Sequence, residues 1–71
     1  MDDATHLGRL IRTYRRMVEL PQWRLAGAIG RSPAWLSNLE QGRVVASPED
    51  LCRIASALHL PSKIFIRSDA A

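Results

Sequence analysis

The sequence contains a single cysteine and no long apolar run. One cysteine cannot form an internal disulfide, which fits a protein of the reducing cytosol. Cys52 falls at an apolar position of a predicted helix, so we expect a buried structural thiol. The apolar runs are far shorter than the roughly 20 residues that span a bilayer. The acidic start, residues 1–5, lacks the apolar segment of a secretory signal. No membrane partner is expected.

The sequence also lacks the residue groupings that metal sites and catalytic sites require. His6 and His59 are far apart, with no acid or cysteine at ligand spacing. We find no Ser-His-Asp arrangement, glycine-rich phosphate loop or paired carboxylate site. A chain of 71 residues buries only about 60% of its unfolded surface, which leaves little room for a deep cleft. We expect no metal, no cofactor and no enzymatic activity.

Positive charge is present and is carried almost entirely by arginine. The chain has ten Lys and Arg residues, of which Lys63 alone is a lysine, and a formal net charge of +3. Arginine pairs well with phosphate and with guanine edges. The composition therefore favours a nucleic-acid partner, although a GC-rich coding bias produces the same enrichment.

Apolar spacing and capping residues predict five short helices in an all-α domain. The predicted helices cover about 5–18, 21–29, 33–41, a segment that starts at Ser47, and 61–66. The first helix has an inward apolar face made of Leu7, Leu10, Ile11, Tyr14 and Val18, with Arg9, Arg12 and Arg16 outside. The best strand candidate, residues 64–66, is too short to be convincing. We expect a single domain over residues 1–71, with an ordered core of about 5–66.

Two of these helices form a helix-turn-helix pattern between Gln22 and Gln41. They are about eight residues long and are joined by a short turn that contains Gly30. Ala26 is small where the helices cross, and Gly30 supplies a positive φ. Inward apolar residues seal the wedge between the helices: Leu25, Ile29, Leu36 and Leu39.

These residues resemble the Xre/Cro-type helix-turn-helix family, which includes the lambdoid phage repressors and Cro proteins. The most specific pieces are Gln22, Leu25-Ala26, Ile29-Gly30 and the run Leu36-Ser37-Asn38-Leu39-Glu40-Gln41-Gly42-Arg43. The similarity extends from about Leu7 to Phe65. It implies a compact five-helix, lambda-repressor-like domain that binds double-stranded operator DNA as a homodimer.

The resemblance assigns roles on both parts of the motif. Helix 33–41 is the recognition helix, and its base-reading positions are Ser32, Pro33, Ala34, Ser37, Asn38 and Gln41. Pro33 and Ala34 can only touch a thymine methyl, so hydrogen bonding to base edges falls to Ser37 and Asn38. Gln41 or Arg31 is a further candidate for such a bond. This is a lean reading surface, and we expect DNA shape to supplement it.

Phosphate contacts are expected from Gln22, Trp23, Arg31 and Arg43. Gln22 matches the glutamine at the start of the second helix, which contacts a phosphate in members of the family. Pro21 replaces the Ser or Thr that often precedes this glutamine. For Arg31 a solvated surface position is an equal alternative. For Trp23 and for Trp35, packing on the core or a neighbouring loop is the alternative to contact with DNA.

Two further roles concern the stability of the fold and its assembly. The family pairs an Arg late in the first helix with a Glu late in the third, and Arg15 and Glu40 match this partly buried ion pair. The apolar end of the chain, Ile64, Phe65 and Ile66, is the expected dimer patch.

We therefore predict a DNA-binding transcriptional regulator, specifically a repressor on a two-fold operator. The alternative is a protein-interaction module or antitoxin-like partner with the same fold.

Overall fold

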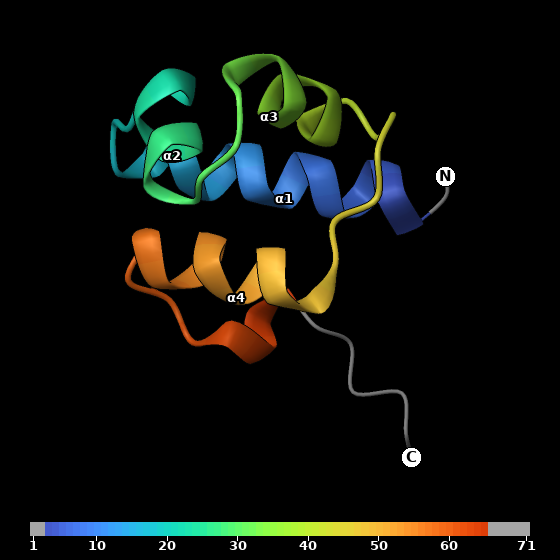
Figure 1. The fold of residues 1–71 in the computed structure, drawn as a ribbon. Coiled ribbons are helices and arrows are strands. Elements are labelled where there is room, and N and C mark those ends of the chain that lie inside the picture. Colours follow the sequence, from blue (N-terminus) through green and yellow to red (C-terminus); the bar gives the residue numbers. More distant parts are fainter. Residues whose placement is uncertain (1–2, 66–71) are drawn as a thin grey trace.

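The first helix is the longest element, and the other elements pack on two sides of it. The computed structural model describes residues 3–65. Its elements are α1 (Asp3–Met17), α2 (Gln22–Ala28), α3 (Pro33–Glu40), α4 (Pro48–Ala57) and the short 3₁₀ helix η1 (Ser62–Ile64). Figure 1 shows α2 and α3 together on one side of α1 and α4 with η1 on the other. The all-α class is thus confirmed over this part of the chain.

The predicted fifth helix is wrong, because residues 62–64 form a single 3₁₀ turn. Among the described residues there are four α-helices. The amide of Ile64 bonds to the carbonyl of Pro61 at 3.1 Å, three residues back, which is the 3₁₀ pattern. Pro61 follows a chain reversal in which His59 has φ +59°.

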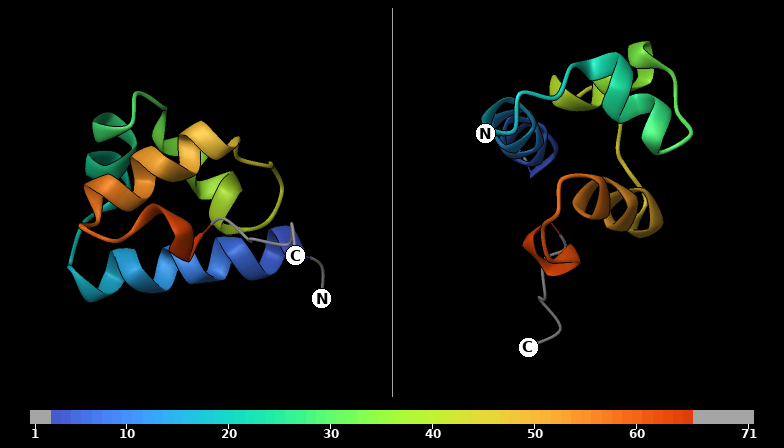
Figure 2. Two further views of the ribbon diagram at one scale, coloured as in Figure 1. Left: turned by 90° about the horizontal axis from the view of Figure 1, so that it is seen from below. Right: turned by 90° about the vertical axis from the view of Figure 1, so that its left-hand side faces the viewer.

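The core lies between α1, the α2–α3 pair and α4. The right-hand view of Figure 2 shows these helices surrounding the interior. The largest fully buried side chains are Ile11 from α1, Leu25 from α2, Leu36 and Leu39 from α3, and Ile54 from α4. Every α-helix thus contributes to one apolar cluster, which is how a chain this short obtains a continuous core.

The end of α1 differs from the prediction. Val18 was expected to face inward, but it is 52% exposed. The helix ends at Met17 and the chain reverses through Glu19, which has φ +55°. Leu20, beyond the reversal, is the residue that packs against the core.

The turn between α2 and α3 has the geometry that its sequence predicts. Gly30 has φ +73°, the left-handed conformation that glycine adopts without strain. The amide of Arg31 then bonds back to the carbonyl of Ala26 at 2.9 Å and closes the end of α2. Ser32 caps α3 by accepting a hydrogen bond from the amide of Trp35. These local bonds set the angle at which α3 leaves α2.

Gly8 allows α1 and α3 to approach closely. A Cβ at this position would lie 2.4 Å from the carbonyl oxygen of Leu39 and 2.7 Å from that of Glu40. A side chain cannot occupy that space. The C-terminal end of α3 therefore rests directly on the backbone of α1, and this contact fixes the position of α3.

The start of α4 is a complete capping box. The Ser47 hydroxyl accepts from the amide of Asp50, and the Asp50 carboxylate accepts from the amide of Ser47. The apolar face of α4 begins at Leu51, so Cys52, one position later, points outward. The prediction of a buried Cys52 is wrong, since this cysteine is exposed. None of the helices within residues 3–65 has the length and apolar character needed to cross a bilayer.

Candidate nucleic-acid interface

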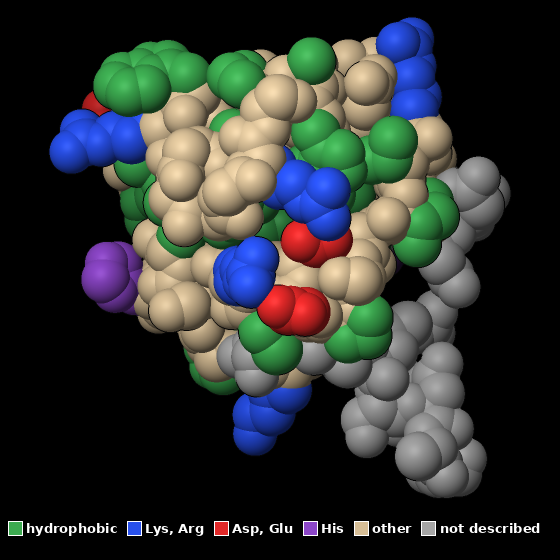
Figure 3. Space-filling view, viewed as in Figure 1, with side chains coloured by type: hydrophobic (Ala, Val, Ile, Leu, Met, Phe, Trp, Pro, Cys, Tyr) green, Lys and Arg blue, Asp and Glu red, His purple; other side chains and the backbone are tan. Residues whose placement is uncertain are grey.

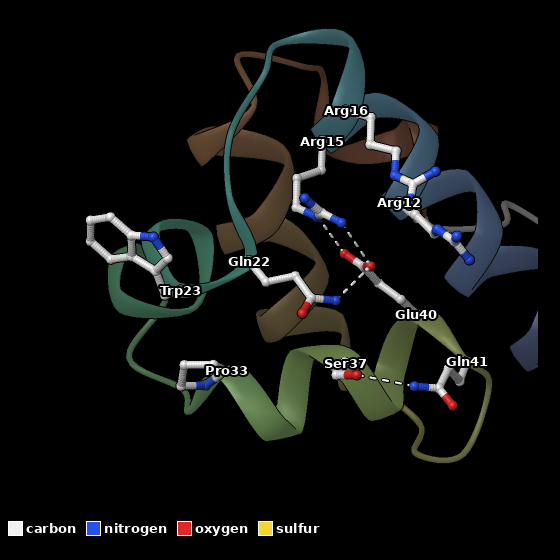
Figure 4. A pocket seen from close by; sticks show the side chains of 9 residues that line it. All are labelled: Arg12, Arg15, Arg16, Gln22, Trp23, Pro33, Ser37, Glu40 and Gln41. Atoms are coloured by element: carbon white, nitrogen blue, oxygen red, sulfur yellow. Dashed lines mark hydrogen bonds and ion pairs between the residues drawn. The ribbon is translucent and has the colours of Figure 1, made fainter.

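A groove of about 700 Å³ lies where α1, α2 and α3 meet. Figure 4 shows α1 along one side of it, α3 along the other, and side chains of α2 between them. Its lining is mostly cationic and polar: Arg12, Arg15, Arg16, Gln22, Trp23, Pro33, Ser37, Glu40 and Gln41. Five of these nine residues come from the set assigned to DNA contact by the sequence: Gln22, Trp23, Pro33, Ser37 and Gln41.

A buried ion pair forms the base of the groove. The Nε of Arg15 donates to Oε2 of Glu40 at 2.6 Å, and its Nη2 donates to Oε1 at 3.1 Å. The two residues are 8% and 4% exposed. Arg15 also donates to the carbonyl of Leu20 at 2.9 Å. The pair that the family resemblance implies is present, and it connects the end of α3 to α1.

Gln22 joins this pair from α2. Its Nε2 donates to Oε1 of Glu40 at 3.0 Å, so Glu40 receives hydrogen bonds from both α1 and α2. A glutamine amide carries two N–H donors, and this bond uses one of them. The carboxylate of Glu40 therefore orients Gln22 and leaves its second donor available to a ligand in the groove.

The outward face of α3 carries the predicted base-reading residues. Ser32, Pro33, Ala34 and Gln41 are exposed, whereas Ser37 and Asn38 are half-buried. The side-chain amide of Gln41 donates to the Ser37 hydroxyl at 3.0 Å, along one turn of the helix. Ser32 accepts the capping bond described above, and its hydroxyl proton remains a donor.

Arg31 is held by the protein itself. Its Nη2 donates to both carboxylate oxygens of Asp50, at 3.2 and 3.0 Å, and its guanidinium lies 4.6 Å from the centre of the Trp35 ring. Figure 3, in the view of Figure 1, shows cationic side chains directly against acidic ones near the middle of the molecule. This arrangement ties the helix-turn-helix turn to α4, and the Arg31 side chain is still 43% exposed, so its contact with a DNA phosphate stays a prediction.

Asp50 is ionised in this arrangement. Burial raises the pKa of its carboxyl group, but hydrogen bonds from the Arg31 side chain and from the Ser47 backbone and hydroxyl outweigh burial, and the net pKa is lowered. The aspartate therefore serves α4 as a cap and Arg31 as a counter-ion.

The two tryptophans differ in their surroundings. Trp35 is half-buried and packs against the core, as the packing alternative proposed. Trp23 is 66% exposed, and its ring extends outward from α2 at the edge of the groove. Arg43 is also exposed, in the loop after Gly42, and its backbone amide bonds to the carbonyl of Asn38 at 2.9 Å.

The expected dimer patch does not have the exposure that this role requires. Phe65 is only 4% exposed, and its ring packs edge-on to Tyr14 with the ring centres 6.0 Å apart. Ile64 is half-buried against the core. Ile66 lies outside the described residues. The prediction of Phe65 as a dimer contact is wrong, because its ring is buried in the core against Tyr14 and is not accessible to a second copy.

Sequence reasoning missed two features of the groove. Arg12 and Arg16 were placed on the outer surface, whereas both line the groove. Helical spacing carried part of this signal, since Arg16 lies four positions after Arg12 and Arg15 lies three positions after it, and residues three or four apart share a helix face. Gly8 was the second omission, because a lone glycine inside a helical pattern indicates close packing. Within residues 3–65, His, Cys, Asp and Glu form no group of three that could hold a metal.

Comparison with known proteins identifies the family. The family model described as a helix-turn-helix domain matches residues 6–63. A relative, the ImmF control region 10 kDa protein of Bacillus phage phi105, is 40% identical over 60 residues, which cover 84% of this chain and 67% of that protein.

Solved structures of the clp gene regulator ClgR from Corynebacterium glutamicum share the fold. Two of them superpose with TM-scores of 0.88 and 0.86 at 30% identity. They cover 93% of this chain and 70% and 86% of the respective ClgR chains. With a family match over most of its length and a helix-turn-helix at its centre, the chain belongs to the Xre/Cro-type helix-turn-helix family of DNA-binding transcription regulators.

Proposed function

We propose that this regulator represses transcription by occupying a two-fold operator as a homodimer, with α3 in the major groove of each half-site. The observation that supports this most directly is the outer face of α3. Its exposed polar side chains, including Gln41, adjoin a groove lined with arginines. Polar groups that read base edges, next to cations that hold the backbone, are the two components of specific DNA recognition.

Asn38 is the proposed principal base contact. An asparagine amide can bond to both N6 and N7 of adenine, and such a bidentate pair discriminates by about 1–3 kcal/mol. Ser37 has its hydroxyl oxygen engaged by Gln41 and can still donate. Asn38→Ala should weaken binding to the preferred site by that amount and binding to random duplex much less. Equal losses of affinity for both DNAs would mean that Asn38 contacts a DNA phosphate instead of a base.

Backbone contacts are proposed for Gln22, Trp23 and Arg43. Glu40 orients the Gln22 amide, as described above. Trp23 has an exposed indole N–H that can reach a phosphate or a sugar. Arg43 lies in the loop after α3, at the far end of the recognition helix from Ser32. These groups bracket α3 along its length and would hold it in register on the duplex.

The small reach of one α3 supports the proposed homodimer. Eight residues at 1.5 Å each span about 12 Å, which is enough for only a few base pairs. A second copy related by two-fold symmetry would read a half-site about 34 Å away, one helical turn along the duplex. The self-complementary surface lies elsewhere than at Phe65.

Selection of bound fragments from random duplex DNA tests this proposal. We expect the recovered sequences to contain two inverted half-sites with centres about 10 base pairs apart. A reporter with this sequence across its promoter should fall in expression when the protein is present. Recovered sites without two-fold symmetry would refute the dimer, and increased reporter expression would refute repression. The phage relative, described as a control-region protein, and ClgR, described as a gene regulator, both support a role of this kind.

A protein-interaction function is the second candidate, and exposed apolar side chains favour it. Met17, Val18 and Trp23, around the α1–α2 turn, are each more than half exposed. A gel shift with random duplex at low salt separates the two candidates. A module dedicated to a protein partner would show no shift, whereas a DNA-binding regulator retains nonspecific affinity.

A further inference from the structure

Two arginines of α1 point toward the proposed DNA-binding side of the molecule. Arg12 and Arg16 lie one helical turn apart, are exposed, and line the groove together with Gln22, Ser37 and Gln41. Figure 4 shows them on the α1 side of the groove, near the Arg15–Glu40 pair. The helix-turn-helix motif itself consists of α2 and α3, so α1 adds a third element to this surface.

The charges of these two arginines are not compensated by the protein. Glu40 is the one acidic residue in the groove lining, and its carboxylate is engaged by Arg15 and by Gln22. Across residues 3–65, neither Arg12 nor Arg16 takes part in an ion pair. Like charges at this spacing on a helix repel each other. The groove therefore holds an excess of positive charge that an anion would relieve.

Two arginines outside the groove contrast with this pair. Arg31 is paired with Asp50 and Arg53 with Glu49, at 3.0 and 2.6 Å. Neither of these pairs lines the groove. These two arginines, at the turn before α3 and on α4, are neutralised by the protein, whereas Arg12 and Arg16 beside the groove are not.

We propose that Arg12 and Arg16 bind a backbone phosphate of duplex DNA lying across the groove, so that α1 contacts DNA alongside α2 and α3. This inference rests on the proposed function. Two guanidinium forks match the oxygens of one phosphodiester, and the free N–H of Gln22 provides a further donor in the same groove. Such a contact carries no base specificity. It sets the position of α1, and the close packing at Gly8 transmits that position to α3.

The test measures how affinity for a random-sequence duplex depends on salt. Fluorescence anisotropy with a labelled duplex gives log affinity against log salt for the unaltered protein and for Arg12→Gln/Arg16→Gln. If the two arginines share one phosphate, the slope becomes shallower by about 0.9, and affinity near 0.1 M salt falls roughly tenfold. The melting temperature should stay the same or rise, because removing the like charges relieves repulsion.

Two control variants make the result specific. Arg53→Gln/Lys63→Gln removes the same charge from α4 and η1, away from the groove, and should leave the slope unchanged. Arg12→Lys/Arg16→Lys keeps the charge and should retain most of the slope. The proposal is overturned if the groove variant and the α4–η1 variant change the slope equally, if neither changes it, or if the lysine variant loses as much as the glutamine variant. Failure of the unaltered protein to bind any duplex would overturn the proposed function as well, which distinguishes the two failures.

Discussion

Replacing Gly8 with alanine should destabilise the protein, although the same change in an ordinary helix stabilises it. Gly8 lies within α1, where helix propensity alone favours alanine by about 1 kcal/mol. The added Cβ would sit 2.4 Å from the Leu39 oxygen and 2.7 Å from the Glu40 oxygen, both of which are backbone atoms. These atoms cannot move aside without displacing α3. Overpacking of this kind costs about 1–3 kcal/mol or more.

The net loss should be about 2 kcal/mol, since backbone obstruction puts the overpacking cost at or above the top of its usual range and the propensity gain offsets only part of it. In a domain of this size this corresponds to a fall in melting temperature of about 10 °C. Gly27→Ala is the matched control, because Gly27 lies in α2 and has nothing within 4 Å of its virtual Cβ. That variant should gain about 0.4–1 kcal/mol.

Urea unfolding followed by circular dichroism measures both variants on the same scale. The reasoning requires opposite signs for the two alanines. If Gly8→Ala were as stable as Gly27→Ala, α1 and α3 could not be in backbone contact at this point. Gly8→Ala should also weaken operator binding in protein that remains folded, because the C-terminal end of α3 would be displaced.

Three further predictions concern buried side chains. Arg15→Ala and Glu40→Ala should each cost about 3–5 kcal/mol, and the double variant should cost less than their sum; strict additivity in urea unfolding would mean that the residues do not interact. Phe65→Ala should lower stability by about 3–5 kcal/mol through loss of core packing, whereas Val45→Ala, at a highly exposed site, should have little effect on melting temperature; similar melting temperatures for the two variants would contradict the burial of Phe65. Because the pKa of Asp50 is lowered in the folded state, its ionised carboxylate contributes stability that is fully present above the ordinary value of 3.8 and is lost as pH falls through the lowered pKa. Asp50→Asn should therefore be less stable than the unaltered protein at pH 7 and differ little from it in strong acid. A constant difference in stability across that pH range would count against the reasoning.

Local signals in the sequence were sufficient to locate the four α-helices and the motif, but not the 3₁₀ turn at 62–64. Ser32, Gly30 and Ser47 act on the backbone within a few residues of themselves, so their roles follow from local chemistry. Apolar spacing identified most of the core faces for the same reason, with Val18 and Cys52 as the exceptions. The family resemblance then supplied the Arg15–Glu40 pair, which spans 25 positions and which helical spacing alone does not identify.

Tertiary structure decided which side chains find partners and which remain free. Arg31 and Arg12 are both exposed arginines in the sequence pattern, yet folding brings Asp50 to the first and leaves the second unpaired beside the groove. The sequence predicted Phe65 as a contact for a second copy, but in the folded protein its ring packs against Tyr14 of α1. Such outcomes depend on contacts between residues far apart in the chain, and a pattern with a period of a few residues carries no information about them.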